Sequence, residues 1–122
     1  MYQQSVPPIP DSIDSVGVWV RGIAQAERPD LAYAAEQAAR ALVSAAIRRT
    51  GQGERIHTQI DVSQDSLRIE VQDPGGSDYS GGFETAELSS TATSFGASGD
   101  HNGHRAWVIL RRRREVRRDL GR

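Results

Sequence analysis

Hydrophobic positions near the N-terminus recur with the spacing of a helix. Asp11 or Ser12 can cap its first turn, because side-chain oxygens there accept hydrogen bonds from free backbone N–H groups. Upstream, the three prolines of residues 1–10 indicate an extended leading segment, with an edge strand at Tyr2 to Val6. The apolar positions that define this helix follow one another at intervals of three and four residues: Ile13, Val16, Val20 and Ile23.

A second and clearer helical pattern runs from Leu31 to Arg49. Pro29 and Asp30 open it. Thr50 and Gly51 close it, since glycine accepts the left-handed conformation that often follows a helix. Eight of its residues are alanines, whose small side chains allow neighbouring elements to approach the helix axis closely. The face that we expect to be buried contains Leu31, Ala35, Ala38, Leu42, Ala45 or Ala46, and Arg49.

Beyond Gly53 the spacing of apolar positions changes to a period of two, which is typical of strands with one buried face. Residues 64–66 form a turn, so the two alternating runs predict a hairpin. The first run is Ile56, Thr58, Ile60 and Val62, and the second is Leu67, Ile69 and Val71.

A second hairpin is predicted near the C-terminus, where Ser94 to Ser98 pairs with Arg105 to Arg111. The turn between them contains Asn102 and Gly103, and an Asn-Gly pair tolerates the positive φ that tight hairpins require. The last strand is expected to direct Ala106, Val108 and Leu110 to one side and Trp107 and Ile109 to the other.

The stretch between the hairpins is richer in turn-forming residues. Residues 74–82 contain four glycines and a proline and form a loop, and Phe83 to Ala92 is expected to form a short helix. The order is therefore helix, helix, hairpin, short helix, hairpin. It predicts an α+β protein, a two-layer α/β sandwich with helices on one face of a mixed or mostly antiparallel sheet.

Length and composition narrow the class of protein. The chain of 122 residues is long enough for one domain, expected over residues 1–110, followed by a basic tail over 111–122. The absence of cysteine excludes disulfides, thiolate zinc sites and cysteine nucleophiles. The absence of lysine excludes Schiff-base chemistry and a P-loop lysine. Without an apolar run of membrane length or an apolar leader, we expect a cytoplasmic protein that makes no use of a membrane.

Charge is distributed unevenly between this domain and the tail. The net charge is −1, yet the tail carries seven arginines against Glu115 and Asp119. The block from Arg111 to Arg118 is able to bind nucleic acid or an acidic partner by releasing counterions. A solvated terminus is the simpler interpretation of the same block.

Histidine and tryptophan offer weaker candidates. His101 and His104 lie near Asp100, a spacing that allows a metal site, but polar turn residues are the simpler account and we predict no metal there. His57 alternates outward on its strand and is expected to be solvated. Trp107, like Trp19, is expected to lie in the core or to contact a partner.

Four segments together resemble the histidine-kinase-like ATPase domain, and most closely its small bacterial anti-sigma-factor serine-kinase type. They are residues 42–50, residues 67–75, Phe95-Gly96 and residues 106–110. The resemblance covers residues 5–111 and implies a Bergerat-like fold with ATP and magnesium as ligands. It also implies a sigma factor or an anti-sigma antagonist as partner, and homodimers.

Two residues of that family's long helix are replaced in this chain. The family has a glutamate at the position of Ala41 and an asparagine at the position of Ala45. The glutamate accepts a proton from the attacking hydroxyl and the asparagine ligates magnesium, and a methyl group does neither. The resemblance therefore implies a pseudokinase without catalytic residues.

The nucleotide-binding positions match the family in part. Asp73 and Gly75 correspond to the residues that hold adenine, and Gly81 and Gly82 to the glycines of the phosphate-binding lid. Glu84 stands near a position where the family has glycine, and its charge opposes a triphosphate. Any bound ATP or ADP is expected to lack well-ligated magnesium.

Three functions remain open at this point. The first is a degenerate ATPase-fold regulator of the anti-sigma-factor kinase type that acts by protein–protein interaction. The second is an ATP-binding protein or serine kinase with a residual nucleotide site. The third is a nucleic-acid accessory protein that uses the arginine-rich tail.

Overall fold

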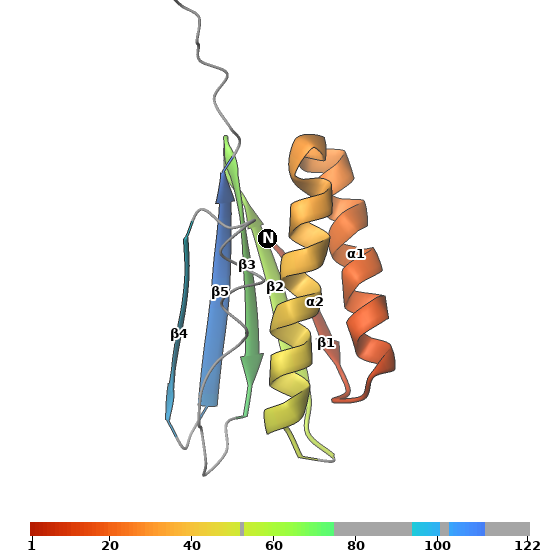
Figure 1. Ribbon diagram of the computed structural model, residues 1–122, viewed down its shortest axis with the longest axis vertical. Coiled ribbons are helices and arrows are strands. Elements are labelled where there is room, and N and C mark those ends of the chain that lie inside the picture. The colour runs from red at the N-terminus through yellow and green to blue at the C-terminus, as the bar shows by residue number, and fades with distance from the viewer. Residues whose placement is uncertain (52, 75–93, 101–102, 112–122) are drawn as a thin grey trace, which may run out of the picture.

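The computed structural model describes residues 1–51, 53–74, 94–100 and 103–111. In chain order the elements are β1 (Tyr2–Val6), α1 (Asp11–Glu27), the 3-10 turn η1 (Pro29–Leu31), α2 (Ala32–Arg49), β2 (Ile56–Val62), β3 (Ser66–Asp73), β4 (Ser94–Asp100) and β5 (Gly103–Arg111). The described strands form one antiparallel sheet in the order β1-β2-β3-β5-β4. Both helices lie on one face of this sheet, which confirms the predicted two-layer α/β sandwich (Figure 1).

The core lies between the helices and the sheet, and it is built from the predicted apolar faces. Alternation along the strands and helical spacing along α1 and α2 direct these side chains to the same layer. Leu42 of α2 and Ile69 of β3 are almost completely buried. The other fully buried aliphatic side chains include Val16, Val20, Val43, Ile56, Ile60, Leu67, Val71, Val108 and Leu110.

The ends of the helices differ from the prediction. Neither Asp11 nor Ser12 caps α1 with its side chain, because Ser12 Oγ instead donates to the carbonyl oxygen of Pro7 at 2.7 Å. At the C-terminal end of α2, Thr50 follows the helix in an extended conformation. Thr50 Oγ1 donates to the Ala46 carbonyl at 2.6 Å and satisfies a free acceptor of the last turn. A left-handed Gly51 is therefore not required. Among the described glycines, the one with positive φ is Gly53, at 86°.

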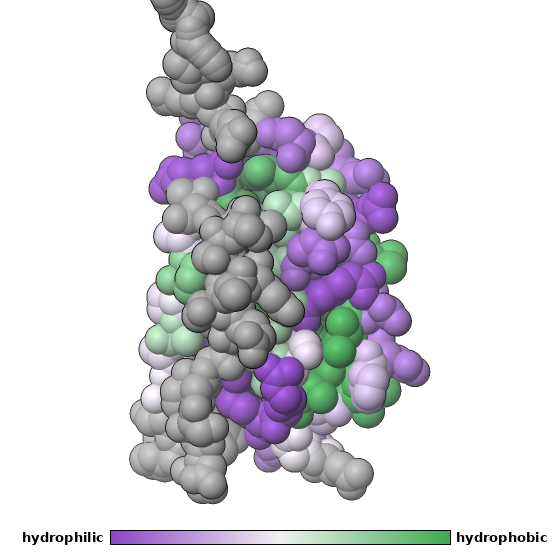
Figure 2. Space-filling model, viewed as in Figure 1, coloured by the Kyte–Doolittle hydropathy of each residue, from purple (hydrophilic) through white to green (hydrophobic). Residues whose placement is uncertain are grey.

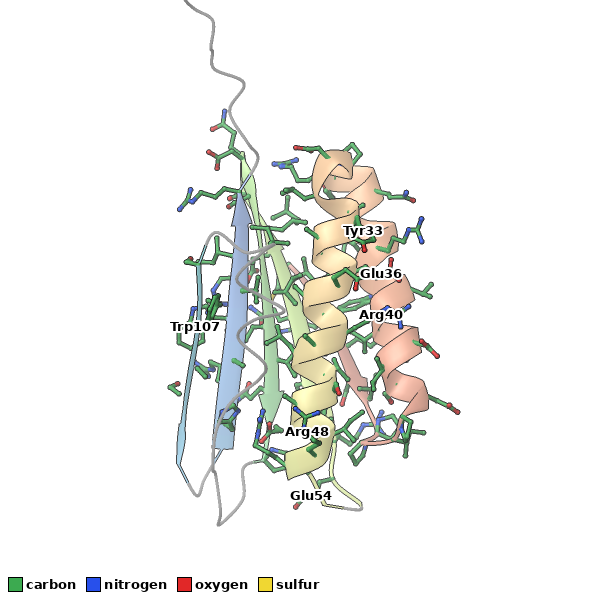
Figure 3. The ribbon with its side chains drawn as sticks, in the orientation of Figure 1. Tyr33, Glu36, Arg40, Arg48, Glu54 and Trp107 are labelled. Carbon is green, nitrogen blue, oxygen red and sulfur yellow. The ribbon has the colours of Figure 1, made fainter. Side chains whose placement is uncertain are left out.

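An arginine of α2 joins the two helices on their polar side. Arg40 donates to Glu36 of its own helix at 2.8 Å and to Asp14 of α1 at 2.5 Å (Figure 3). Its guanidinium lies over Gly17, where an added Cβ would be only 2.8 Å from Arg40 Cζ. Gly17 thus provides the close approach that this ion pair requires, at the expense of helix propensity.

The C-terminal hairpin is present, with one difference at its turn. Asp100 pairs with Gly103, so Gly103 belongs to β5 rather than to the turn, while Asn102 lies outside the described residues. The alternation predicted for β5 is confirmed, since its even-numbered positions are buried. The short helix expected at residues 83–92 also falls outside the described residues. Neither described helix is long and apolar enough to span a bilayer.

Candidate functional site

A buried ion pair lies where the end of α2 meets the end of β3. Asp73 is the last residue of β3, and its side chain is completely buried. Arg49, the last residue of α2, donates to Asp73 Oδ2 from Nη2 at 2.9 Å and from Nε at 3.2 Å. Both donors belong to one planar guanidinium, so the carboxylate is held in a fixed orientation.

A histidine completes this cluster. His104 is the residue of β5 paired with Asp73 in the sheet register, and its Nδ1 lies 3.6 Å from Asp73 Oδ2. The prediction that His104 is a polar turn residue is wrong, because β5 begins at Gly103 and His104 therefore lies inside the strand, at 2% exposure. Burial lowers the pKa of His104, and the charge of Arg49 lowers it further, while Asp73 opposes this shift.

Protonation of His104 makes stability depend on pH. Its pKa in the folded state is lowered below 6.5, the ordinary value, which holds in the unfolded chain. At a pH between the folded-state pKa and the unfolded-state pKa, the unfolded chain binds a proton that the folded chain does not. We expect the free energy of unfolding to fall as pH drops through this window, by at most about 1.4 kcal/mol per pH unit. Denaturant unfolding at several pH values tests this, with His104→Gln as the control that lacks the dependence. An equal pH dependence in both proteins would contradict it.

The resemblance also singles out two alanines of α2 and three glycines. Ala45 is 1% exposed and belongs to the core, and the half-buried Ala41 packs against the same core. Gly75, Gly81 and Gly82 lie outside the described residues.

The sequence correctly predicts that Arg49 lies on the buried face of α2, but it does not predict which residue Arg49 contacts. The available signal was its position on an otherwise apolar helix face, because a charge directed toward a core requires a counter-charge. Asp73, at the end of a buried strand, is that counter-charge.

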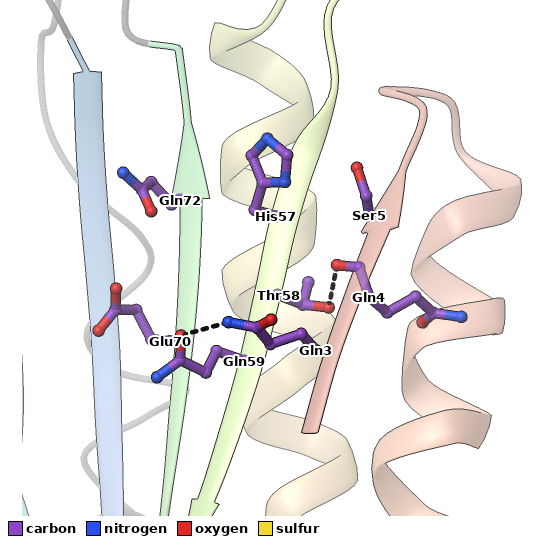
Figure 4. Close-up of a pocket in the computed structure, with 8 residues that line it drawn as sticks. All are labelled: Gln3, Gln4, Ser5, His57, Thr58, Gln59, Glu70 and Gln72. Carbon is purple, nitrogen blue, oxygen red and sulfur yellow. Dashed lines mark hydrogen bonds between the residues drawn. The ribbon is translucent and has the colours of Figure 1, made fainter. Parts of the chain in front are cut away.

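A shallow pocket of about 350 Å³ lies next to this cluster, lined by Glu54, Arg55, His57, Gln72, Asp73 and Pro74. A second pocket, of about 400 Å³, lies on the sheet face opposite the helices (Figure 4). It is lined mainly by neutral polar groups, including Gln3 Nε2, which donates to Gln59 Oε1 at 3.3 Å. His57 is exposed at its rim, as predicted. Among the described residues, no group of three or more histidine and carboxylate side chains is placed to hold a metal ion.

The rest of that outer face carries a charged network around Trp107. Glu70 pairs with Arg68 at 2.6 Å and with Arg105 at 3.0 Å, and it is largely buried between them. The guanidinium of Arg68 lies 5.8 Å from the centre of the Trp107 ring, within cation–π range. Trp107 also covers Gly96, where an added Cβ would lie 2.5 Å from the ring. This half-exposed tryptophan between arginines has the composition of a protein-binding surface.

The helical side of the molecule is different. Figure 2 shows a mainly hydrophilic surface over α1 and α2, with small separate hydrophobic areas. Val18 and Tyr33 are the exposed large hydrophobic side chains of these two helices, at 65% and 74%. Of the basic block, Arg111 ends β5 within 3.9 Å of Asp65, and residues 112–118 lie outside the described part.

Comparison with protein-family models and with curated proteins gives no match to this chain.

Proposed function

We propose that this chain is a small regulatory protein with a degenerate histidine-kinase-like ATPase fold, related to the anti-sigma-factor kinases, which acts by binding another regulatory protein. The observation that carries the proposal is the buried pair between Arg49 and Asp73. At the position where the resemblance calls for an adenine-binding carboxylate, the Oδ2 atom already accepts two hydrogen bonds from one guanidinium.

The residues of α2 support the same proposal. The resemblance implies that the magnesium of a bound triphosphate takes an oxygen ligand from this helix, and Ala45 offers only a methyl group inside the core. The general base that the resemblance implies is also missing from its position, because Ala41 has no group that accepts a proton. The described residues of the implied site therefore do not fit a magnesium nucleotide.

The order of the elements supports the framework of the proposal. One strand, two helices, a hairpin ending in Asp73 and a final hairpin follow in the order that the resemblance implies. We infer that this arrangement is Bergerat-like. The polar sheet face around Trp107 provides a binding surface that does not use the nucleotide position. A sigma factor or an anti-sigma antagonist is the partner class that the resemblance implies.

Thermal unfolding with ATP and magnesium tests the loss of nucleotide binding. We expect no change in melting temperature, because a ligand stabilises the folded state only if it binds it. Ligand at 100 times its Kd would add about 2.7 kcal/mol to the free energy of unfolding. Magnesium without ATP, and ATP without magnesium, are the matched controls. A melting temperature that rises with ATP concentration would establish a residual nucleotide site and contradict the proposal.

Interaction with a partner is tested separately. Calorimetric titration of candidate sigma factors and anti-sigma antagonists is expected to give saturable binding that ATP does not change. A parallel assay with radiolabelled ATP is expected to show no phosphate transfer to them. Transfer would overturn the pseudokinase assignment, and failure to bind any of these candidates would overturn the proposed partner class.

A further inference from the structure

Strand β5 presents a cation and two apolar side chains in a row on the outer face of the sheet. Its even-numbered residues are buried on the helix side, so the side chains of Arg105, Trp107 and Ile109 point away from the helices. Trp107 lies next to Gly96 of β4, on the side away from both helices (Figure 3). Arg105 is exposed, and the other two are half-buried. All three are therefore open to a molecule that approaches this face.

Arg105 shares its carboxylate partner with another arginine. Its Nε lies 3.0 Å from Glu70 Oε2, and Arg68 donates to Oε1 of the same carboxylate at 2.6 Å. Both oxygens of Glu70 are thus engaged. Asp61 also lies on this face, but it belongs to β2, two strands and roughly 10 Å away from Arg105. It is paired across the strands with Arg68 and accepts a hydrogen bond from Gln59 at 2.8 Å. The terminal nitrogens of Arg105 therefore remain available for a further carboxylate.

The neighbours of Arg105 across the sheet do not occupy these nitrogens. The register places Gln72 of β3 and Ser98 of β4 directly beside it, and both are exposed and uncharged. Within the part of the chain that the structure describes, neither Nη atom of Arg105 donates a hydrogen bond. The two Nη atoms of a guanidinium lie side by side in one plane, a geometry that matches the two oxygens of a carboxylate. Arg105 is thus prepared to bind an acidic side chain end-on.

We propose that Arg105, Trp107 and Ile109, which we name the β5 row, bind an extended acidic segment of the protein partner. A carboxylate of that segment binds Arg105, and apolar side chains pack on Trp107 and Ile109. Side chains of an extended segment repeat their direction every two residues, as those of β5 do, so alternate residues of the segment reach all three members. Tryptophan and arginine are also the residues that most often dominate protein interfaces. This inference rests on the proposed function, since it specifies the chemistry of the proposed partner.

A protein segment fits the β5 row better than single-stranded nucleic acid does. Bases bind such surfaces by stacking on the open face of an aromatic ring. The ring of Trp107 contacts Gly96, and the guanidinium of Arg68 lies over it, 5.8 Å from its centre, so it is not an open platform. A run of phosphates would also pass close to the carboxylates of Glu70 and Asp61, which repel it. An aliphatic side chain needs only the exposed rim of the indole, and a single carboxylate needs only Arg105.

Calorimetric titration of the full chain with the capped peptide Ser-Glu-Ser-Leu-Ser-Leu-Ser-Glu-Ser tests the proposal, because this peptide matches the β5 row in either direction. We expect saturable binding that salt weakens, and no binding of the same peptide with glutamine in place of glutamate. Arg105→Gln is expected to weaken binding about tenfold or more, since it removes a charge-assisted hydrogen bond. Arg21→Gln is the matched control and keeps binding, because Arg21 is similarly exposed, at 58% against 51%, and also lies beside a largely buried glutamate, Glu36.

A second pair of variants keeps the test valid if Arg105→Gln fails to fold. Ser98→Glu places a carboxylate of the chain itself beside Arg105 and is expected to block the peptide, whereas Ser98→Gln leaves binding unchanged.

Three results would overturn the proposal. The first is no binding by the unchanged chain. The second is binding that survives both Arg105→Gln and Ser98→Glu, which would show that the arginine-rich tail attracts the peptide. The third is tighter binding of a thymidine oligonucleotide that Arg105→Gln abolishes, which would assign the β5 row to nucleic acid. A sigma factor or anti-sigma antagonist that binds Arg105→Gln as tightly as the unchanged chain would overturn this inference alone and leave the proposed function intact.

Discussion

Replacing Arg49 by methionine is expected to lower the free energy of unfolding by about 3–5 kcal/mol. Methionine keeps an apolar stem of similar length but removes both donors to Asp73 Oδ2. The Asp73 side chain is completely buried, so its charge then lacks the guanidinium that compensates it. Urea unfolding monitored by circular dichroism measures the loss.

Two variants isolate the role of the pair. Arg48→Met changes the neighbouring arginine, which is exposed and bonds only weakly to Ser44 Oγ at 3.3 Å, and is expected to alter stability by less than about 0.5 kcal/mol. Adding Asp73→Asn to Arg49→Met removes the uncompensated charge and is expected to restore part of the loss. Strictly additive effects of the two substitutions would show that the ion pair contributes no coupling.

The strands and helices were predictable because each has one buried face. In β3, Leu67, Ile69 and Val71 alternate along the strand, and all three are buried. The helix ends were less predictable, because competing acceptors decide them. Ser12 has the composition of a cap, but a nearby carbonyl of Pro7 binds its hydroxyl instead. Local composition limits the choices at a helix end without selecting among them.

The candidate site was harder to predict because its members come from three elements distant in sequence. Asp73 was found through a resemblance, and Arg49 through the period of its helix. Their pairing requires knowing that the end of α2 packs beside the end of β3. His104 was misinterpreted because the Asn-Gly pair just before it predicts a turn. In the structure β5 already begins at Gly103, so His104 lies inside the strand and is buried.

Restoring the family's asparagine at position 45 is expected to damage the fold rather than create a nucleotide site. Ala45 is 1% exposed in the core between α2 and the sheet. Ala45→Asn adds volume to this packed layer and places an amide where apolar side chains surround it. We expect a loss of about 2–6 kcal/mol, since overpacking and an unsatisfied polar group each cost about 1–3 kcal/mol.

Ser44→Asn is the matched control, because it introduces the same side chain one residue earlier at a half-exposed position of the same helix. We expect it to change stability by less than about 0.5 kcal/mol. Chemical denaturation of both variants, with and without magnesium and ATP, separates the two interpretations of position 45. If Ala45→Asn kept its stability and its melting temperature rose with magnesium ATP, the position would face an open nucleotide site. A large loss of stability without any response to nucleotide would place it in a closed core, where one substitution cannot restore a magnesium ligand.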